Sequence, residues 1–394
     1  MKKKLKNFYL NIEKKEKSKI INKIKKNLNE YYFPLKNNYT INKFKILISK
    51  YNAKEDLFYK LKPILSIIIP LYNGEKTLLN GLLSIEVQNE KNIEIIYVDD
   101  YSIDNSKKII KEIQKIDKRI ILYENEKNKG IFYTRSYGIN KARGKYILTL
   151  DQDDLYVNKN LFNILLNTAE ENKLDIVNFE FVILKNKLDF QNMFSKPNYN
   201  KIINKKELNK IKNILNFEFS FFTWDKLVKR NIYNKALDLI GKENLNILIN
   251  TVEDVTITSS LFKIANNYMK IKLYGHCYIK SEFQTSDIYY KMKTNKINNI
   301  NQKEIDNFIN SFFESLKILF KISGNTTEEK SLLFKRLFYQ VKLPIYEKKI
   351  ENNYTKNLVL EVTNIFIKSK FFNDKEINSI KEFVKNFKIN NNIF

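Results

Sequence analysis

The chain has 394 residues, of which 43% are hydrophobic and 29% are charged, a composition typical of globular proteins and not of disordered ones. A single cysteine, Cys277, and a single histidine, His276, argue against a disulfide framework, a Cys/His zinc site and a Ser-His-Asp triad. Any metal would therefore be held by oxygen ligands.

The formal charge is +26, from 70 Lys and Arg against 44 Asp and Glu, and such a surplus favours phosphate-rich partners. Lysine far outnumbers arginine, however, and Lys, Asn and Ile dominate throughout, which a biased base composition explains. The arginine forks that read bases and phosphates are scarce, so we expect no nucleic-acid partner.

Residues 1–62 are Lys-rich, lack glycine and show patches of helical periodicity, which predicts a basic helical N-terminal extension. Charges interrupt its start too often for a signal peptide, and no stretch reaches the roughly 18 apolar residues of a membrane span. We expect a cytoplasmic protein, with peripheral contact at the cytoplasmic face of an anionic membrane as an open alternative.

From residue 63 onward, short apolar runs alternate with amphipathic segments. The runs are Ile-rich on both faces, as in parallel strands covered by helices, and the segments between them have room for right-handed crossovers. The pattern therefore predicts an α/β domain with a Rossmann-like, mostly parallel sheet flanked by helices. The predicted strands cover 64–69, 93–98, 119–123, 146–150 and a run that begins at Asp175.

Past Asn200 the pattern becomes mostly helical, and apolar pairs recur at helix spacing toward the C-terminus. We assign residues 63–290 to the α/β domain and residues 291–394 to a helical C-terminal accessory region.

Acidic residues cluster where two predicted strands end. Neighbouring carboxylates repel one another unless a cation or hydrogen-bond donors neutralise them, and open α/β sheets bind ligands beyond the carboxyl ends of their strands. The clusters therefore imply a ligand. They are Asp99, Asp100 and Asp104 after the second strand, and Asp151, Asp153 and Asp154 after the fourth.

In extended chain, residues i and i+2 point to the same side, so Asp151 and Asp153 can aim two carboxylates at one Mg²⁺ or Mn²⁺ shared with phosphate oxygens. The alternative is that these residues, and Asp154 among them, cap a helix expected over 156–171.

The stretch from Ile64 to Leu161 resembles the inverting glycosyltransferases of family 2, which have the GT-A fold. The order and spacing of the motifs carry the resemblance. They are Leu65-Ser66-Ile67-Ile68-Ile69-Pro70-Leu71-Tyr72-Asn73-Gly74-Glu75, Gln88, Glu94 to Asp100 with Ser102 and Asp104, Asn128-Lys129-Gly130, Arg135, Gly138, Ala142 to Ile147, and Leu150 to Asp154.

The resemblance implies metal-dependent transfer of a sugar, with inversion, from a nucleoside-diphosphate sugar to a hydroxyl of a glycan or lipid-linked acceptor. The donor is expected to be a UDP- or dTDP-sugar, because Asp100 would accept a hydrogen bond from the imide N–H that uracil and thymine share. The resemblance implies that Asp254 is the general base and that Asp153 and Asp151 hold Mn²⁺ or Mg²⁺. It places Trp224, Asp225 and Glu253 near the donor sugar or acceptor. The residues implied to bind the nucleotide-sugar are Pro70, Tyr72, Glu75, Asp100, Arg135, Asp151 and Gln152.

Several of these residues also have purely structural interpretations. Tyr72 could be an ordinary loop tyrosine, Arg135 could form a structural salt bridge, and the Glu253-Asp254 pair would suit the dipole at any helix start. Trp224 could be a core residue. We assign no role to His276, which we expect at a strand edge.

The chain departs from the family pattern at Tyr101, which stands where the usual Asp-Asp-Gly-Ser motif has glycine, so donor choice is less defined than the fold. Neither a Gly-x-Gly-x-x-Gly fingerprint after the first strand nor a Walker motif is present, which disfavours dinucleotide redox chemistry and P-loop hydrolysis. Two alternatives stay open: a nucleotidyltransferase on a related fold, and an inactive basic adaptor that binds anionic membrane or polymer.

Overall fold

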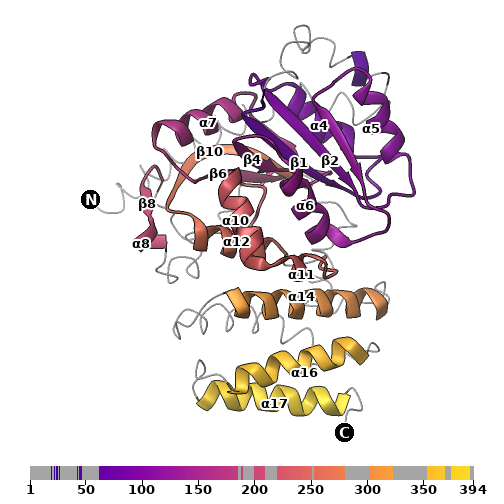
Figure 1. Cartoon of the computed structure of the whole chain (residues 1–394), viewed down its shortest axis with the longest axis vertical. Coiled ribbons are helices and arrows are strands. Elements are labelled where there is room, and N and C mark those ends of the chain that lie inside the picture. The colour runs from indigo at the N-terminus through magenta and orange to yellow at the C-terminus, as the bar shows by residue number, and fades with distance from the viewer. Residues whose placement is uncertain are drawn as a thin grey trace.

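The computed structural model of the chain describes residues 62–184, 188–189, 199–208, 220–250, 253–279, 302–322, 353–368 and 374–390, together with isolated positions between residues 19 and 46. Its centre is one mixed sheet covered by helices on both faces (Figure 1). The α/β class predicted from the sequence is confirmed.

The first half of the sheet is parallel. Its strands lie in the order β3-β2-β1-β4, and Leu65 of β1 pairs with Ile93 on one side and Tyr146 on the other. All residues of β1 and β2 are buried, as the Ile-rich runs predict. The four predicted strands are confirmed with small shifts at their ends: β1 (Leu65–Leu71), β2 (Ile93–Asp99), β3 (Ile120–Glu124) and β4 (Tyr146–Thr149).

Alternate residues of β1 enter two apolar clusters on opposite faces of the sheet. Ile67 and Ile69 pack with α4 (Leu78–Glu86), α5 (Ser106–Gln114) and α7 (Leu161–Glu171). Ile68 packs on the other face, with α6 (Gly130–Lys141), α10 (Arg230–Ile240) and α12 (Glu253–Ile264). This two-sided cover follows from the side-chain alternation of a strand.

The second half of the sheet mixes directions. The predicted strand from Asp175 is confirmed as β6 (Ile176–Leu184), and β9 (Lys226–Lys229) runs antiparallel between β4 and β6. The long β10 (Asn267–Ile279) pairs in parallel with β6. The shorter elements are β5 (Leu155–Tyr156) and β8 (Ile202–Asn204), both antiparallel to β10, β7 (Leu188–Asp189), antiparallel to β6, and the helices α8 (Lys205–Leu208) and α11 (Lys242–Leu245).

The described part of the chain past Asn200 is mostly helical, as predicted, but β8, β9 and β10, which the sequence did not predict, complete the sheet. Two other expectations are corrected. The helix expected over 156–171 begins at Leu161, since Tyr156 pairs with His276 across β5 and β10. His276 is fully buried inside the sheet and does not lie at its edge.

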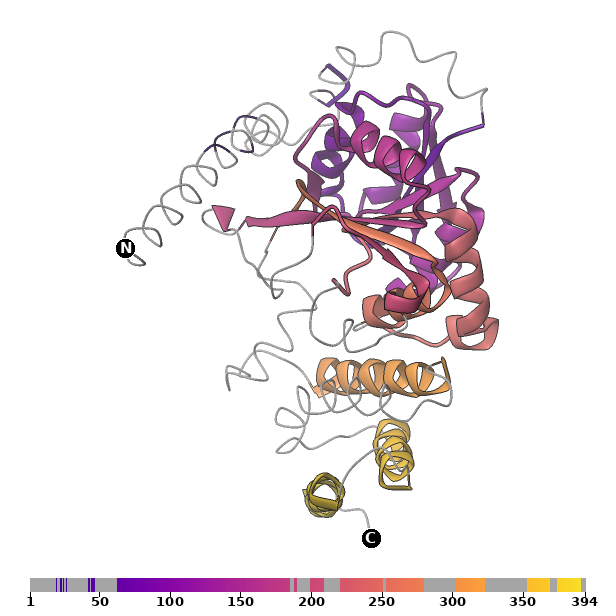
Figure 2. The same cartoon turned by 90° about the vertical axis from the view of Figure 1, so that its left-hand side faces the viewer.

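The predicted C-terminal helices are confirmed as α14 (Gln302–Ile322), α16 (Asn353–Lys368) and α17 (Asp374–Asn390), which lie beyond the sheet in successive layers (Figures 1 and 2). Ile318 and Ile322 of α14 join the apolar cluster of α10 and α12. Most of the predicted extension over 1–62 lies outside the described residues. Within the described part of the chain, no helix is long and apolar enough to cross a membrane.

Helix α6 approaches β1 and β2 at Gly138, and this contact tests the packing. A Cβ atom on Gly138 would lie 2.6 Å from Cγ2 of Ile68 and 3.0 Å from Cγ2 of Val98. We expect Gly138→Ala to lower the free energy of unfolding by about 1–3 kcal/mol, because two buried β-branched side chains would have to shift. The measurement is urea-induced unfolding.

The matched control is Asn140→Ala, on the exposed side of the same helix, with an expected change within about 0.5 kcal/mol. Equal midpoints for Gly138→Ala and wild type would contradict this packing.

Candidate active site

The carboxyl ends of β1, β2 and β4 bring three loops together at one edge of the sheet. The Asp100 N–H donates to the Leu71 carbonyl at 2.7 Å, which joins the first two loops. Gln152 joins the first loop to the third, because its Oε1 accepts from the Tyr72 N–H at 2.8 Å and its Nε2 donates to the Tyr72 carbonyl at 2.9 Å. The predicted residues Tyr72, Asp100 and Gln152 therefore meet at one place.

Glu75 strengthens the junction of the first two loops. Its carboxylate accepts from both the backbone N–H and the side-chain amide of Asn105 at 2.9 Å, and its own N–H donates to Asp104 at 3.0 Å. Pro70 is buried as the penultimate residue of β1. Both residues shape the edge of the sheet through protein contacts.

Two tyrosines stand exposed at this edge. Tyr72 is 47% exposed and Tyr101 is 52% exposed. Tyr101 has φ +68°, a left-handed conformation that glycine adopts readily and tyrosine adopts at a cost. The substitution identified in the sequence is therefore accommodated by strain in a surface residue, and the turn itself is kept.

The Asp100 carboxylate is buried and holds the start of α6. Its Oδ1 accepts from the Asn125 amide and the Lys129 N–H, both at 2.8 Å, and its Oδ2 accepts from the Gly130 N–H at 2.8 Å. Gly130 has φ +82°, which only glycine adopts without strain. A carboxylate accepting backbone N–H groups at a helix start is a stable arrangement, so Asp100 organises this loop in the protein itself.

The acidic turn after β4 contains Asp151, Gln152, Asp153 and Asp154. Asp151 and Asp153 are partly exposed, whereas Asp154 is fully buried. Asp154 does not cap a helix: its Oδ2 lies 2.9 Å from Nε2 of His276, and its Oδ1 accepts from the Ile279 N–H at 2.8 Å. Burial, together with Asp153 and Asp151, raises the pKa of Asp154, and burial lowers the pKa of His276 to about 3.

One buried guanidinium, that of Arg135 on α6, joins the acidic turn to the start of α12. Its Nη2 donates to Oδ1 of Asp151 and its Nη1 donates to Oε1 of Glu253, both at 2.7 Å, and Nη1 lies 3.6 Å from Oδ1 of Asp254. Burial alone would lower the pKa of Arg135, but the nearby Asp151, Asp254 and Glu253 more than offset it and raise that pKa above its usual range. The salt-bridge interpretation of Arg135 is thus observed, between two predicted site segments.

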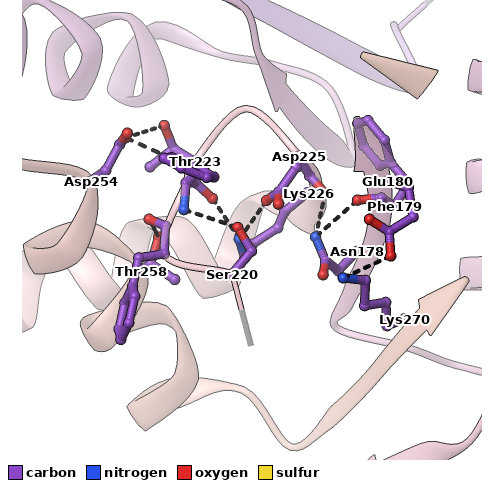
Figure 3. A network of polar contacts seen from close by, with 12 residues as sticks. Asn178, Phe179, Glu180, Ser220, Thr223, Asp225, Lys226, Asp254, Thr258 and Lys270 are labelled. Carbon is purple, nitrogen blue, oxygen red and sulfur yellow. Dashed lines mark hydrogen bonds and ion pairs between the residues drawn. The ribbon is translucent and has the colours of Figure 1, made fainter. Parts of the chain in front are cut away.

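Asp254 lies in the first turn of α12, next to Glu253. Thr223 donates to its Oδ1 through the side-chain hydroxyl at 2.6 Å and the backbone N–H at 3.3 Å (Figure 3). Every hydrogen bond and ion pair described for Asp254 involves Oδ1. Burial, followed by the negative charge of Glu253, raises the pKa of Asp254 to about 7, although its side chain keeps 21% exposure. A carboxyl with these properties is suited to accept a proton near neutral pH.

Buried side chains hold the loop that carries Thr223 in place. Trp224 is 3% exposed and stacks on Phe222, with ring centroids 4.4 Å apart. Lys226 is fully buried and its ammonium contacts Asp225 at 2.5 Å, while Asn178 donates to the Asp225 carbonyl at 2.7 Å (Figure 3). Their burial supports a packing role for Trp224 and Asp225 beneath the site.

The described residues contain no group of three or more His, Cys, Asp or Glu side chains that could hold a metal ion unaided. Asp151 and Asp153 still offer carboxylate oxygens, which suit Mg²⁺ or Mn²⁺ when phosphate oxygens and water complete the coordination. The residues present therefore fit a metal shared with a diphosphate.

Sequence reasoning missed Thr223, Asn125 and His276 as contributors to this region. Thr223 and Asn125 act through side-chain hydrogen bonds to residues 31 and 25 positions away, which leave no periodic pattern in the sequence. The only available signal was the position of Thr223 beside Trp224, within a segment already matched to the family.

Comparison with known proteins gives the following similarities. Residues 66–230 match the sequence family described as glycosyl transferase family 2. The chain is 31% identical over 232 residues to "Uncharacterized glycosyltransferase EpsJ" of Bacillus subtilis, which covers 58% of this chain and 64% of that protein. It is 34% identical over 117 residues to "Glycosyltransferase GlyG" of Streptococcus pneumoniae, covering 30% and 38% respectively. The chain thus spans less than two thirds of these relatives.

Among solved structures, the crystal structure of S. aureus TarS 1-349 in complex with UDP aligns with a TM-score of 0.47 and 17% identity. The alignment covers 82% of this chain and 89% of that one.

The Arg135 cluster yields a stability prediction. Arg135→Gln leaves neighbouring carboxylates without a buried cation, and we expect the free energy of unfolding at pH 8 to fall by about 3–5 kcal/mol. The loss should be smaller at pH 5, below the pKa of about 7 that burial and Glu253 give Asp254, because the folded cluster then holds protons and repels itself less. Urea unfolding in chelator-containing buffer at both pH values measures this.

Arg135→Lys is the matched control, since it keeps the charge but cannot bridge both carboxylates, and its loss should be smaller. A loss independent of pH would show that the guanidinium acts by packing and not by charge.

Proposed function

We propose that this chain, whose residues 66–230 are a family 2 glycosyltransferase domain, transfers a sugar with inversion from a nucleoside-diphosphate sugar to an acceptor hydroxyl. The observation that carries the proposal is the Arg135 bridge. It ties Asp151, in the turn suited to a metal and diphosphate, to Glu253 and Asp254, and the Asp254 carboxyl has a pKa of about 7.

The proposed step is one in-line displacement. The acceptor oxygen forms a bond to the anomeric carbon while the bond from that carbon to the diphosphate oxygen breaks, and the acceptor proton passes to Asp254. A single displacement inverts the anomeric centre and needs one base. Burial raises the pKa of both Asp254 and Asp154, but of these two side chains only that of Asp254 is partly exposed. Thr223 donates to Oδ1 of the Asp254 carboxyl, so in this proposal Oδ2 is the oxygen that takes the acceptor proton.

Mn²⁺ or Mg²⁺ held by Asp153 and Asp151 would neutralise the charge that develops on the leaving diphosphate. Arg135 keeps Asp151 oriented within this turn through its bond to Oδ1. Gln152 holds the turn against the Tyr72 loop, so that the metal ligands and the nucleotide-binding loop stay in register.

The proposed donor is a UDP-sugar. Tyr72 offers an exposed aromatic face against which a planar base can lie. Asp100 already accepts three hydrogen bonds from the protein, and a carboxylate has about four acceptor positions, so one remains for the imide N–H of uracil. The proposed acceptor is a glycan or a lipid-linked saccharide, handled in the cytoplasm or at its membrane face, and the charge of +26 is compatible with an acidic one.

The experiment that tests this proposal is a donor screen. Purified protein is incubated with UDP-, dTDP-, GDP- and CMP-sugars, with Mn²⁺ or with chelator, and released nucleotide is quantified with water and a panel of glycosides as acceptors. Metal-dependent release of UDP from one donor is the expected result. Release of pyrophosphate would identify a nucleotidyltransferase instead, and absence of binding by every donor would favour the adaptor.

Asp254→Asn tests the base. We expect nucleotide release to fall by about 10²–10⁴-fold, because Asn has the same shape but cannot accept the proton, while donor affinity changes little. Release assays and calorimetric donor titration measure the two effects. Asp238→Asn, on the exposed side of α10, is the control and should behave as wild type.

The same assignment predicts a pH profile. Burial and Glu253 raise the pKa of Asp254 to about 7, and only the ionised carboxylate accepts a proton, so the rate should rise with pH to about 7 and then level. Thr223→Val removes a hydrogen bond that lowers this pKa and should move the midpoint upward, whereas Thr223→Ser should not. A flat profile in wild type would rule out Asp254 as the base.

Asp153→Ala tests the metal. We expect the thermal stabilisation by UDP plus Mn²⁺ to shrink to the level seen with chelator, because the bridge between carboxylate and diphosphate is lost. Glu126→Ala, an exposed acidic residue outside the site, is the control. Full Mn²⁺-dependent stabilisation in Asp153→Ala would remove Asp153 from the metal site.

A further inference from the structure

The acidic turn is anchored from behind by Asp154. One oxygen of this buried carboxylate meets Nε2 of His276 at 2.9 Å, and the other accepts from the Ile279 N–H at 2.8 Å. The Asp154 N–H in turn donates to the Asp151 carbonyl at 3.0 Å. Because both oxygens are held by one strand, β10, the turn cannot rotate without breaking these bonds.

The His276 ring links Asp154 to the loop that carries Thr223, because its face stacks on Trp224. His276 stacks on Trp224 with ring centroids 4.2 Å apart and planes at 16°. Trp224 stacks on Phe222 at 4.4 Å and 14°, and Phe181 meets Trp224 edge-on at 4.9 Å. The indole therefore lies between two parallel rings and is closed at its edge.

Thr223 lies between Phe222 and Trp224 in the chain, and its hydroxyl and N–H both donate to Oδ1 of Asp254. Stacked rings at both neighbours restrict where Thr223 can lie. A continuous series of contacts thus runs from Asp154 through His276 and Trp224 to Thr223 and Asp254.

We propose that His276 and Trp224 are positioning residues that fix the proposed base, Asp254, relative to the metal-binding turn. This inference rests on the proposed function. His276 is 0% exposed and Trp224 is 3% exposed, so neither contacts substrate. Histidine supplies both requirements at once, a flat ring to stack on the indole and a ring nitrogen to meet the Asp154 carboxylate.

The chain also ties the same two segments together through Arg135, which bonds Asp151 and Glu253 directly. A single connection through Arg135 would let the Asp254 segment rotate relative to the acidic turn. A second connection, through His276 and Trp224, resists that rotation. Catalysis by positioned groups is sensitive to displacements of about 1 Å, so loss of the connection through His276 and Trp224 should reduce turnover more than donor binding.

The test compares three variants of the full chain. His276→Phe keeps the stack and removes the bond to Asp154, Trp224→Leu removes the stack, and Cys277→Ala alters the next buried residue of β10, which packs in a separate cluster with Leu155 and Val157. We expect the first two to lower kcat by about 10–100-fold and to raise the Mn²⁺ concentration for half-maximal rate, with unchanged UDP affinity in chelator. Cys277→Ala should change neither quantity.

A double-mutant cycle separates positioning from general loosening of the fold. If His276 acts through Thr223, the kcat loss of His276→Phe combined with Thr223→Val is smaller than the product of the two single losses. His276→Gln, which keeps a nitrogen donor, should recover part of the Mn²⁺ response and guards against a misfolded Phe variant.

The outcomes distinguish this inference from the proposed function. The positioning role would be overturned if the kcat losses of His276→Phe and Thr223→Val multiplied in the double variant, or if His276→Phe and Trp224→Leu both kept wild-type kcat and Mn²⁺ response. The proposed transferase function would still stand in that case, provided that the wild-type chain turned over and Asp254→Asn was inactive. A wild-type chain that releases no nucleotide from any donor would instead overturn the proposed function.

Discussion

The site depends on one ion-pair constraint, the buried guanidinium of Arg135. Asp151 and Glu253 are far apart in the sequence but lie on the same guanidinium, and two carboxylates held this close would repel each other strongly where little water screens them. Arg135 offers two parallel donors to two different carboxylates and lies close to a third. The fork geometry of arginine makes this possible, because a lysine ammonium could not face both partners in fixed directions.

The carboxyl groups at this edge of the sheet differ in their surroundings. Asp100 accepts three protein hydrogen bonds and stabilises the loop before α6. Among the described residues, Asp254 accepts hydrogen bonds from Thr223, and burial and its neighbour Glu253 raise its pKa to about 7. The environment thus gives chemically identical side chains different properties: Asp100 stabilises a loop, and Asp254 has a raised pKa. The turn at Tyr101 is likewise kept at an energetic cost, because the residue has a strained, left-handed backbone conformation.

The sequence was informative where structure is local and apolar. The Ile-rich runs placed β1, β2, β3, β4 and β6, because buried parallel strands need apolar residues on both faces. It failed at β8, β9 and β10, whose identity as strands depends on pairing with segments far away. His276 illustrates the limit: a lone histidine gives no pattern, yet in the fold it meets Asp154, 122 positions earlier, and stacks on Trp224.

The C-terminal helix α14 packs against the elements that carry the candidate site. Ser311 of α14 accepts the N–H of Asn250, and the side chain of Asn250 accepts the N–H of Ile131 at the start of α6. That start is also where Asp100 binds Gly130, and Asn250 lies just before Glu253 on α12. Since Ile318 and Ile322 share an apolar cluster with α10 and α12, α14 supports both the start of α6 and the start of α12. A displacement of α14 would therefore disturb the loops before α6 and α12 together, so this helix is mechanically coupled to the α/β domain although its sequence pattern separates it.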